Sequence, residues 1–257
     1  MKPYDKFGTV YDTIGHDRFS VHMAEYTLDI LKRFKFQPRD GLDLCCGTCS
    51  AVRVFADHGI AMSGLDRSAQ MLAIARHKLR DRHVSLYRQE LPHFEIKASA
   101  PGRRTSVRQF DLVTCFFDSL NYLRDERQLR ATFKAVRRHL RPGGWFIFDM
   151  NTPYHLRIVF TDQRPYSGVK DNVAWIFRNG PTRVPDAADL LLTIFVRHGK
   201  RWERFDEVHR ERAYSNKVIS AALRDAGFQV KGLYRCLSFE RPIKKTMRVC
   251  FAAKRVG

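Results

Sequence analysis

The sequence predicts an α/β protein built on a doubly wound, mostly parallel sheet, and three observations lead to this fold class. Over the first 150 residues the hydrophobic period changes repeatedly between strand-like runs and helix-like stretches. Five such strands alternate with helices, which is typical of parallel strands joined by crossover helices. The chain has 257 residues, 44% of them hydrophobic, which is enough to bury a sizeable core.

The individual elements of the first 150 residues follow from the same periodicity. Apolar positions such as Val21, Leu28 and Leu31 predict an amphipathic helix over residues 17–36. Ser68 is a suitable N-cap for a later helix. Strands are expected at residues 41–46, 59–65, 83–88, 110–117 and 145–149, and helices at residues 52–58, 69–79 and 126–140.

The pattern changes after residue 150. Strands are expected at 172–178, 189–197 and 201–212 without helices between them, and Gly199 lies in a hairpin turn. Ser215 can cap a helix that Gly227 ends, and two strands, 228–236 and 247–254, close the chain. We therefore expect a core formed by residues 1–150 and 213–257. Residues 151–212 form an antiparallel β insertion over the sheet edge where ligands of open α/β sheets bind.

Charge is the unusual feature of the composition. Lys and Arg total 46 against 27 Asp and Glu, a formal net charge of +19. This excess indicates either a polyanionic partner such as RNA or an ordinary solvated surface. The basic segment 97–108 is expected to be an exposed loop. This loop and four arginines of the insertion could select an anionic acceptor. The arginines are Arg201, Arg204, Arg210 and Arg212.

Other classes of protein are not expected. No window approaches 18 consecutive apolar residues, and the N-terminus lacks the apolar stretch of a secretory signal, so no membrane contact is predicted. The six cysteines show no secreted spacing pattern, which favours reduced thiols in a cytoplasm. These cysteines are Cys45, Cys46, Cys49, Cys115, Cys236 and Cys250.

The first strand-to-helix turn carries the chemistry. Gly47 lets the backbone approach a ligand closely, and the amides of the following helix point at whatever binds there. Asp66 ends the second strand, where an acidic residue about 20 positions after such a turn accepts hydrogen bonds from ribose hydroxyls. The pattern predicts an adenosine-containing cofactor, but G-x-G-x-x-G is absent, which argues against a dinucleotide. A redox or zinc site at Cys46 and Cys49 lacks a second ligand pair.

These residues resemble the class I S-adenosylmethionine-dependent methyltransferases. The usual first motif of that family, an acidic residue followed by alternating small residues, is represented by Asp43, Cys45, Gly47 and Cys49, with Cys49 in place of the third glycine. The fourth-strand motif is Phe110-Asp111 to Asn121-Tyr122, and a turn-and-strand motif runs from Leu140 to Asp149. The resemblance implies a Rossmann-like sheet of seven strands with the last strand antiparallel.

The resemblance also implies roles for individual residues. The segment Tyr4-Asp5-Lys6-Phe7 to Tyr11-Asp12 looks like a lid, so residues 1–36 are expected to cover the cofactor, and residues 205–214 resemble a bacterial branch of aminosugar N,N-dimethyltransferases. The acceptor is expected to contact Asn121, Tyr122, His155, Glu207 and Arg212. The expected ligands of S-adenosylmethionine, whose product is S-adenosylhomocysteine, are Tyr11, Asp43, Cys45, Gly47, Thr48, Asp66, Arg67, Met71, Gln89, Glu90, Phe117 and Asp118.

One expected strand adds a catalytic candidate. Residues 205–214 alternate, so Glu207, His209 and Glu211 share one face. That face can line the acceptor pocket, with His209 as general base because its intrinsic pKa is near neutral. The alternatives are a metal site, which one strand rarely supplies alone, and a solvated, salt-bridged strand. His16 and His155 are further pocket candidates.

Taken with the resemblance, these features predict a methyltransferase that acts on N or O of a small molecule by in-line displacement. The first alternative is an RNA methyltransferase, which the net charge favours, although no RNA-binding module is visible. The second is a regulator that binds the cofactor without turnover, which Cys49 leaves open. The expected protein is a cytoplasmic monomer or homodimer without a bound metal.

Overall fold

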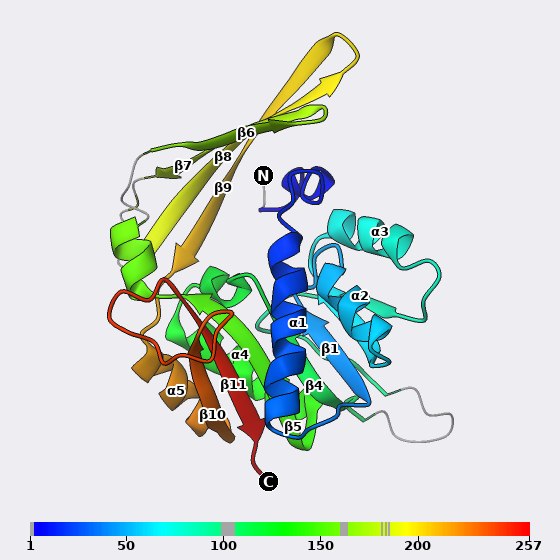
Figure 1. The fold of residues 1–257 in the computed structure, drawn as a ribbon, viewed down its shortest axis with the longest axis vertical. Coiled ribbons are helices and arrows are strands. Elements are labelled where there is room, and N and C mark those ends of the chain that lie inside the picture. Colours follow the sequence, from blue (N-terminus) through cyan, green and yellow to red (C-terminus); the bar gives the residue numbers. More distant parts are fainter. Residues whose placement is uncertain (1–2, 99–105, 160–163, 181, 183, 185) are drawn as a thin grey trace.

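A computed structural model of the chain describes residues 3–98, 106–159, 164–180, 182, 184 and 186–257, and these residues form two sheets (Figure 1). The larger sheet has seven strands in the order β10-β11-β5-β4-β1-β2-β3. Only β11 runs antiparallel to its neighbours, so the expected seven-stranded sheet with an antiparallel last strand is confirmed. Its strands are β1 (Asp40–Leu44), β2 (Ala61–Asp66), β3 (Ser85–Arg88), β4 (Phe110–Cys115), β5 (Leu140–Asn151), β10 (Phe228–Arg235) and β11 (Arg248–Arg255).

Helices cover both faces of this sheet, as a doubly wound fold requires. Alternate residues of β5 point to opposite faces of the sheet. Phe146 and Phe148 belong to the apolar cluster shared with α4 and α5, and Trp145 and Ile147 belong to the cluster shared with α1, α2 and α3. Ser68 caps α3 by accepting the amide of Met71 at 3.2 Å, as expected. The helices are α1 (Arg18–Arg33), α2 (Ser50–Asp57), α3 (Ala69–Lys78), α4 (Glu126–His139) and α5 (Asn216–Asp225).

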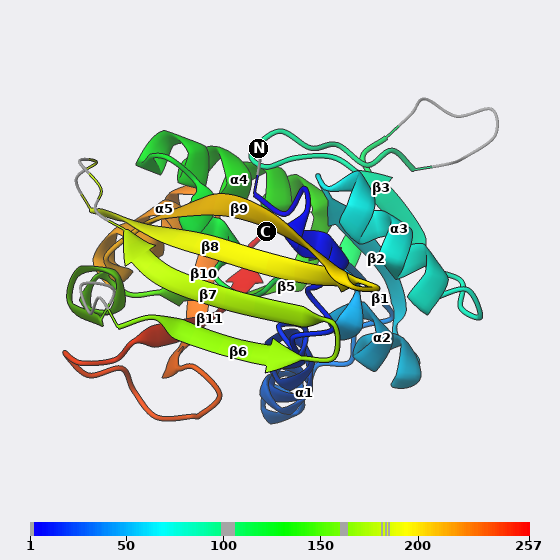
Figure 2. The same ribbon diagram turned by 90° about the horizontal axis from the view of Figure 1, so that it is seen from above.

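The second sheet is antiparallel and has four strands in the order β6-β7-β8-β9. It lies beyond the C-terminal ends of β1, β4 and β5, and seen from above it crosses over them (Figures 1 and 2). The antiparallel insertion expected between β5 and α5 is therefore present. Its strands are β6 (Tyr166–Lys170), β7 (Val173–Gly180), β8 (Ala187–His198) and β9 (Arg201–Arg212).

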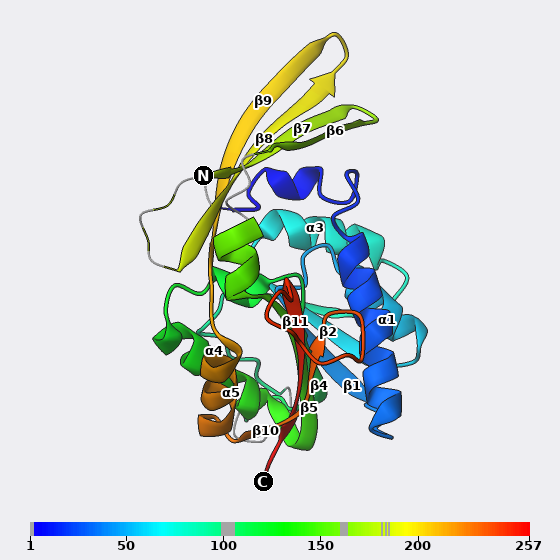
Figure 3. The same cartoon turned by 60° about the vertical axis from the view of Figure 1, so that its left-hand side comes forward.

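The N-terminal segment lies between the second sheet and α3 (Figure 3). A short 3₁₀ turn over Phe7–Thr9 places Phe7 and Tyr11 in a buried apolar cluster with residues of both neighbours. The cluster is completed by Val10, Met71, Val173, Trp175, Phe177, Leu192, Ile194 and Phe205. Burial of these side chains holds the segment against the second sheet.

The structure differs from the expectations at β5 and β6, and part of one expected loop lies outside the described residues. β6 was not expected, because its five residues are mostly exposed and show no alternation of apolar and polar side chains. β5 is longer than expected and continues to Asn151. Residues 99–105 of the expected basic loop lie outside the described residues, and its ends pair where Lys97 bridges Val107. No described helix is both long and apolar enough to span a membrane.

Candidate active site

A cavity of about 540 Å³ opens at the C-terminal ends of β1, β2 and β4. Tyr4 and Tyr11 of the N-terminal segment contribute to its wall opposite the first turn of the sheet. Twelve of the residues expected to bind cofactor or acceptor line it: Tyr11, Asp43, Cys45, Gly47, Thr48, Asp66, Arg67, Met71, Gln89, Glu90, Phe117 and Tyr122. The separate sequence motifs therefore converge on one space.

The turn after β1 has an unusual backbone. Cys45, Gly47 and Cys49 all have positive φ, at 55°, 53° and 64°. A side chain at Gly47 would project toward open space in the cavity, so the bare backbone there leaves room for a ligand. Left-handed backbone is unfavourable for cysteine, which explains why glycines are usual at these positions in the family that the motif resembles.

Gly64 accommodates the cysteine that replaces the third glycine. A side chain added at Gly64 would lie only 2.8 Å from the Sγ of Cys46 and 3.1 Å from the Sγ of Cys49. The two thiols therefore occupy the space above a β2 residue that has no side chain. Cys49 is fully buried on the helix side of the turn and does not line the cavity.

Asp66 connects the two turns of the site. Its Oδ2 accepts the backbone amide of Gly47 at 2.9 Å, and its Oδ1 accepts that of Ser68 at 2.8 Å. Burial raises the pKa of Asp66, although both amides and the neighbouring Arg67 oppose the shift. Each carboxylate oxygen keeps a further lone pair, so Asp66 can accept hydrogen bonds from ribose hydroxyls as well. The site thus fits the adenosine part of the expected cofactor.

Asp43 lies deeper in the site, on β1. Its Oδ1 accepts the hydroxyl of Thr114 at 2.6 Å. Burial raises the pKa of Asp43 to about 7; the Thr114 hydroxyl opposes this shift and the charge of Asp66 adds to it. Asp43 therefore titrates near neutral pH.

The N-terminal segment is fastened to β9 by a single carboxylate. Glu207 Oε2 accepts the amide of Tyr4 at 2.7 Å, and its Oε1 accepts the amides of Lys6 and Phe7 at 2.8 and 2.9 Å. Burial would raise the pKa of Glu207, but hydrogen bonds from His209 and from these three amides lower it below its usual value. On the opposite side, the hydroxyl of Thr48 donates to Asp12 at 2.7 Å.

His209 occupies the centre of a buried chain of polar groups. Its Nε2 is 3.0 Å from Glu207 Oε2, and its Nδ1 is 2.8 Å from the hydroxyl of Tyr122. The hydroxyl of Tyr122 is in turn 3.1 Å from that of Tyr4. Both tyrosines line the cavity and His209 does not, so His209 reaches the cavity through Tyr122.

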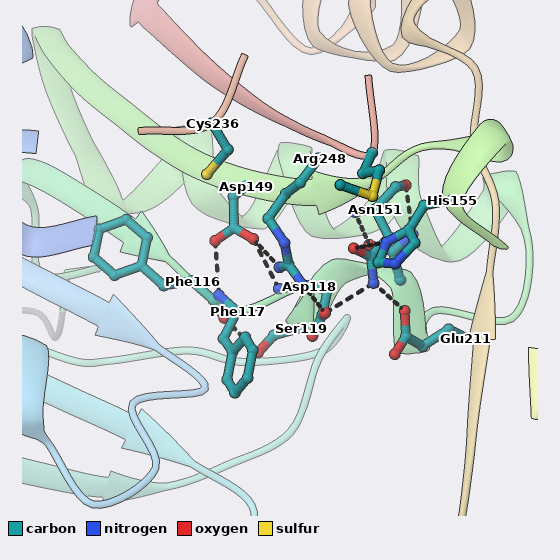
Figure 4. Close-up of polar contacts among 12 residues, drawn as sticks. Phe116, Phe117, Asp118, Ser119, Asp149, Asn151, His155, Glu211, Cys236 and Arg248 are labelled. Atoms are coloured by element: carbon teal, nitrogen blue, oxygen red, sulfur yellow. Dashed lines mark hydrogen bonds and ion pairs between the residues drawn. The ribbon is translucent and has the colours of Figure 1, made fainter. Parts of the chain in front are cut away.

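A second polar cluster lies next to Phe117, which lines the cavity (Figure 4). Asp149 Oδ1 accepts the amide of Phe117 at 2.7 Å, and its Oδ2 accepts that of Asp118 at 3.0 Å. The guanidinium of Arg248 is 2.5 Å from both Asp149 and Asp118 and stacks 4.6 Å from the ring of Phe19. Phe117 and Asp118 are consecutive residues with positive φ, and these contacts hold them in that conformation.

The same cluster holds His155, an expected acceptor contact, and Glu211, which belongs to the β9 face that was expected to line the acceptor pocket. Asn151 donates to Asp118 at 2.8 Å and to Glu211 at 2.6 Å, and it accepts from His155 at 2.9 Å. Burial, with the charge of Asp118, raises the pKa of Glu211 to about 8, while Asn151 and Arg248 oppose the shift. Burial also lowers the pKa of His155 to about 4. Both side chains are thus neutral at neutral pH.

The remaining expected residues lie away from the cavity. Asn121 is fully buried, and its amide bridges backbone groups of Asn151 and Arg212. Arg212 itself donates to the carbonyl of Arg124 at 3.0 Å. His16 lies among aromatic rings, 5.9 Å from Phe117, and burial lowers its pKa to about 4. The cavity lining does not include Asp118, Asn121, His155, Glu207, His209 or Arg212.

Sequence reasoning missed Arg248, as it missed several residues of the cavity lining, among them Ser20 and Ser50. Arg248 begins a strand whose other residues are mostly apolar, and its two carboxylate partners are 99 and 130 residues away in the sequence. No local pattern identifies such a pair. Within the described ranges, no three His, Cys, Asp or Glu side chains are grouped so as to hold a metal ion.

The fold and the cavity define an α/β protein that binds an adenosine-containing ligand under a covering segment. A model of the methyltransferase domain family matches residues 42–146. A relative in Geobacillus sp. (strain WCH70), named "Putative methyltransferase", is 31% identical over 98% of this chain and 99% of its own length. An S-adenosylmethionine-dependent methyltransferase from Clostridium acetobutylicum is 30% identical, with a TM-score of 0.84 over 99% of both chains.

The chain belongs to the S-adenosylmethionine-dependent methyltransferases, and S-adenosylmethionine is its cofactor. A more distant relative comes from Streptomyces venezuelae and is 25% identical over 87% of this chain and 90% of its own length. It is named dTDP-3-amino-3,4,6-trideoxy-alpha-D-glucopyranose N,N-dimethyltransferase.

Proposed function

We propose that this methyltransferase acts on the amino group of a small, sugar-like molecule inside the covered cavity. The observation that carries the proposal is the attachment of the N-terminal segment to Glu207 through the amides of Tyr4, Lys6 and Phe7. With this segment in place, residues 3–11 lie between the cavity and the second sheet. A segment that covers the cavity in this way suits a small acceptor that is enclosed with the cofactor.

Each part of the chain has a defined task in this proposal. Asp66 and the Gly47 backbone bind the ribose end of the cofactor, and residues 151–212 form the acceptor lobe. The cofactor supplies a methyl group on a sulfonium, which is already a good leaving group. The chain therefore mainly orients the acceptor and excludes water, and Tyr11 and Phe117 are placed to do so, with ring centroids 6.4 Å apart.

Two observations favour nitrogen over oxygen as the methylated atom. Burial is the main cause that raises the pKa of the Tyr4 and Tyr122 hydroxyls, and the negative charge of Asp118 adds to the shift of both, so a negative potential reaches this part of the cavity. Carboxyl and aromatic groups together attract an ammonium group. The Streptomyces relative is also named for N,N-dimethylation of an amino sugar.

The arginines of β9 give little support to an RNA substrate. Arg210 makes two hydrogen bonds of 2.6 Å to Asp189, and Arg204 bonds to Asp206 at 3.1 Å. Arg212 donates to a backbone carbonyl. Three of the four insertion arginines thus have partners within the protein, which lowers their availability to phosphate groups.

Transfer of label from tritiated S-adenosylmethionine tests the proposal. The purified protein is given three acceptor sets at equal concentration: nucleotide-linked amino sugars, the matching hydroxyl sugars, and total RNA. We expect label in the amino sugars and only background in the other two. Label in RNA, or equal label in the hydroxyl sugars, would overturn the proposal. Asp66→Ala is the negative control, because it lacks the carboxylate that is proposed to bind the ribose of the cofactor.

A further inference from the structure

The polar chain from Glu207 to Tyr4 has a direction that its donors and acceptors fix. The Glu207 carboxylate only accepts hydrogen bonds, and three of its four contacts are backbone N–H donors. His209 Nε2, 3.0 Å away, must therefore carry a hydrogen and donate it to Glu207. The opposite nitrogen, Nδ1, is then without a hydrogen in the neutral ring, so it accepts the hydroxyl of Tyr122 at 2.8 Å.

This direction leaves two oxygens of the chain with lone pairs toward the cavity, those of Tyr4 and Tyr122, and of the two it is Tyr122 that is bonded to His209. Both nitrogens of His209 are engaged, and its side chain is only 2% exposed. The oxygen of Tyr122 has donated its own hydrogen toward His209, so it accepts the hydroxyl of Tyr4 at 3.1 Å on one lone pair and keeps the other. Because Tyr122 lines the cavity, that remaining lone pair is the accessible end of the chain.

We infer that Tyr122 takes the proton that the acceptor nitrogen loses, while Tyr122 passes its own proton to Nδ1 of His209. The inference rests on the proposed amine acceptor. The N–H bond of the acceptor breaks and an O–H bond forms on Tyr122; the original Tyr122 O–H bond breaks and an N–H bond forms on His209. The resulting imidazolium is neutralised by the Glu207 carboxylate beside it. Tyr122 contacts the acceptor, and His209 and Glu207 are positioning residues.

The two proton movements must be concerted. Burial, together with the nearby Tyr4, Glu211 and Asp118, raises the pKa of Tyr122 well above its usual value, so a free tyrosinate does not form in this site. A tyrosine in this setting can pass a proton on as it receives one. A histidine with both nitrogens bonded and a carboxylate behind it provides the destination.

The covering segment completes the chain at both ends. Tyr4 contacts Tyr122 through its hydroxyl, and the amide of Tyr4 binds Glu207. The ring of Tyr4 also lies edge-on to His209, with centroids 4.7 Å apart. The orientation of His209 is therefore fixed only while the segment is in place, which links closure of the cavity to readiness for proton transfer.

Nitrogen-15 NMR of the histidine-labelled wild-type protein tests the direction of the chain without any substrate. The inference predicts that His209 is neutral, with hydrogen on Nε2 and none on Nδ1. A hydrogen on Nδ1 would mean that His209 donates to Tyr122, which is the reverse of the inferred direction and would overturn the inference. Because this measurement needs no variant, it does not depend on whether a mutant folds.

Kinetics of Tyr122→Phe test the proton transfer itself. We expect kcat for the amine acceptor to fall roughly 100-fold, in the range that general acid–base groups contribute. The affinity for S-adenosylhomocysteine, measured by calorimetry, should change less than about threefold, because Asp66 and Gly47 are untouched. Tyr87→Phe, which removes a tyrosine hydroxyl outside the cavity lining, is the matched control and should retain the wild-type kcat.

The outcomes separate this inference from the proposed function. If the wild-type protein methylates no amine, the proposed function fails before Tyr122 is considered. If the wild-type protein methylates the amine and Tyr122→Phe does so at the same kcat, only the proton transfer is contradicted. His209→Gln should lower kcat more than it raises KM, since His209 does not touch the acceptor. Glu207→Gln should lower kcat and also raise KM, because it releases the segment that covers the cavity.

Discussion

Asp149, at the end of β5, lies 2.5 Å from the guanidinium of Arg248 at the start of β11. The same carboxylate accepts the amides of Phe117 and Asp118, whose left-handed backbone would otherwise be unfavourable. Arg248 also contacts the rings of Phe19 and Phe117. The last strand of the sheet thus sets the position of the aromatic ring that lines the cavity.

Asp149→Asn should therefore lower both stability and activity. The substitution leaves the buried Arg248 with one carboxylate fewer, and it places a side-chain N–H against a backbone N–H. Together we expect these two effects to lower the free energy of unfolding by about 3 kcal/mol. Urea denaturation measures this loss. Glu240→Gln removes half of an exposed ion pair with Arg235 and is the control, with an expected cost below about 1 kcal/mol. An equal effect of both variants would contradict the assigned role of Asp149.

Sequence periodicity predicted most of the larger sheet because its strands and helices repeat local patterns. β4, for example, is buried along its whole length, and four of its six residues are apolar. β6 was missed because its residues are exposed and its pairing with β7 is set by contacts that no local pattern encodes. The same reason explains why some residues of the site were predicted from the sequence and others were not. Gly47 and Asp66 belong to a short-range motif, whereas the partners of Arg248 lie 99 and 130 residues away.

Glu207 shows a further limit of sequence reasoning. The alternation of β9 correctly placed Glu207, His209 and Glu211 on one face, and all three are buried there. What each contacts could not be predicted, because the amides that bind Glu207 belong to a segment about 200 residues earlier. The assignment of His209 as a catalytic group stays a prediction.

Stability in the absence of ligand should depend on the ionisation of Asp43. Its folded-state pKa of about 7 lies above the usual 3.8, so the folded chain holds a proton that the unfolded chain has released. The free energy of unfolding should therefore decrease as pH rises from about 4 to about 7, with no further contribution above that range. Asp43→Asn, which can still accept the Thr114 hydroxyl, should make the decrease shallower. Urea denaturation at several pH values measures it, and an unchanged slope would contradict the assignment.

Closure of the N-terminal segment should depend on the charge of Glu207. The folded-state pKa of Glu207 is lowered, so its stabilising effect is present above the usual value of 4.5 and is lost as pH falls through the folded-state pKa. Glu207→Gln should imitate the acidic state and increase hydrogen–deuterium exchange at Tyr4, Lys6 and Phe7. Glu203→Gln is the comparison on the same strand, because Glu203 meets the segment through the exposed Lys6 ammonium at 2.8 Å and not through a backbone amide. If both variants exchange as the wild type does, Glu207 does not hold the segment.

Cofactor affinity should depend on Asp66. Replacing it with alanine removes charged hydrogen bonds worth roughly 1.5–3 kcal/mol each, so we expect the Kd for S-adenosylhomocysteine to rise roughly 10- to 100-fold or more. Isothermal titration calorimetry measures the change. Asp57→Asn, on the surface at the end of α2, should bind as the wild type does. Unchanged binding by Asp66→Ala would place the cofactor elsewhere.

A crystal structure with S-adenosylhomocysteine is the most direct test of the covered site. The account predicts the ribose against Asp66, the ligand in the cavity beside Phe117, and the amides of Tyr4, Lys6 and Phe7 bonded to Glu207. Ligand bound in the cavity while Glu207 is separated from all three amides, or ligand bound away from Asp66, would contradict it.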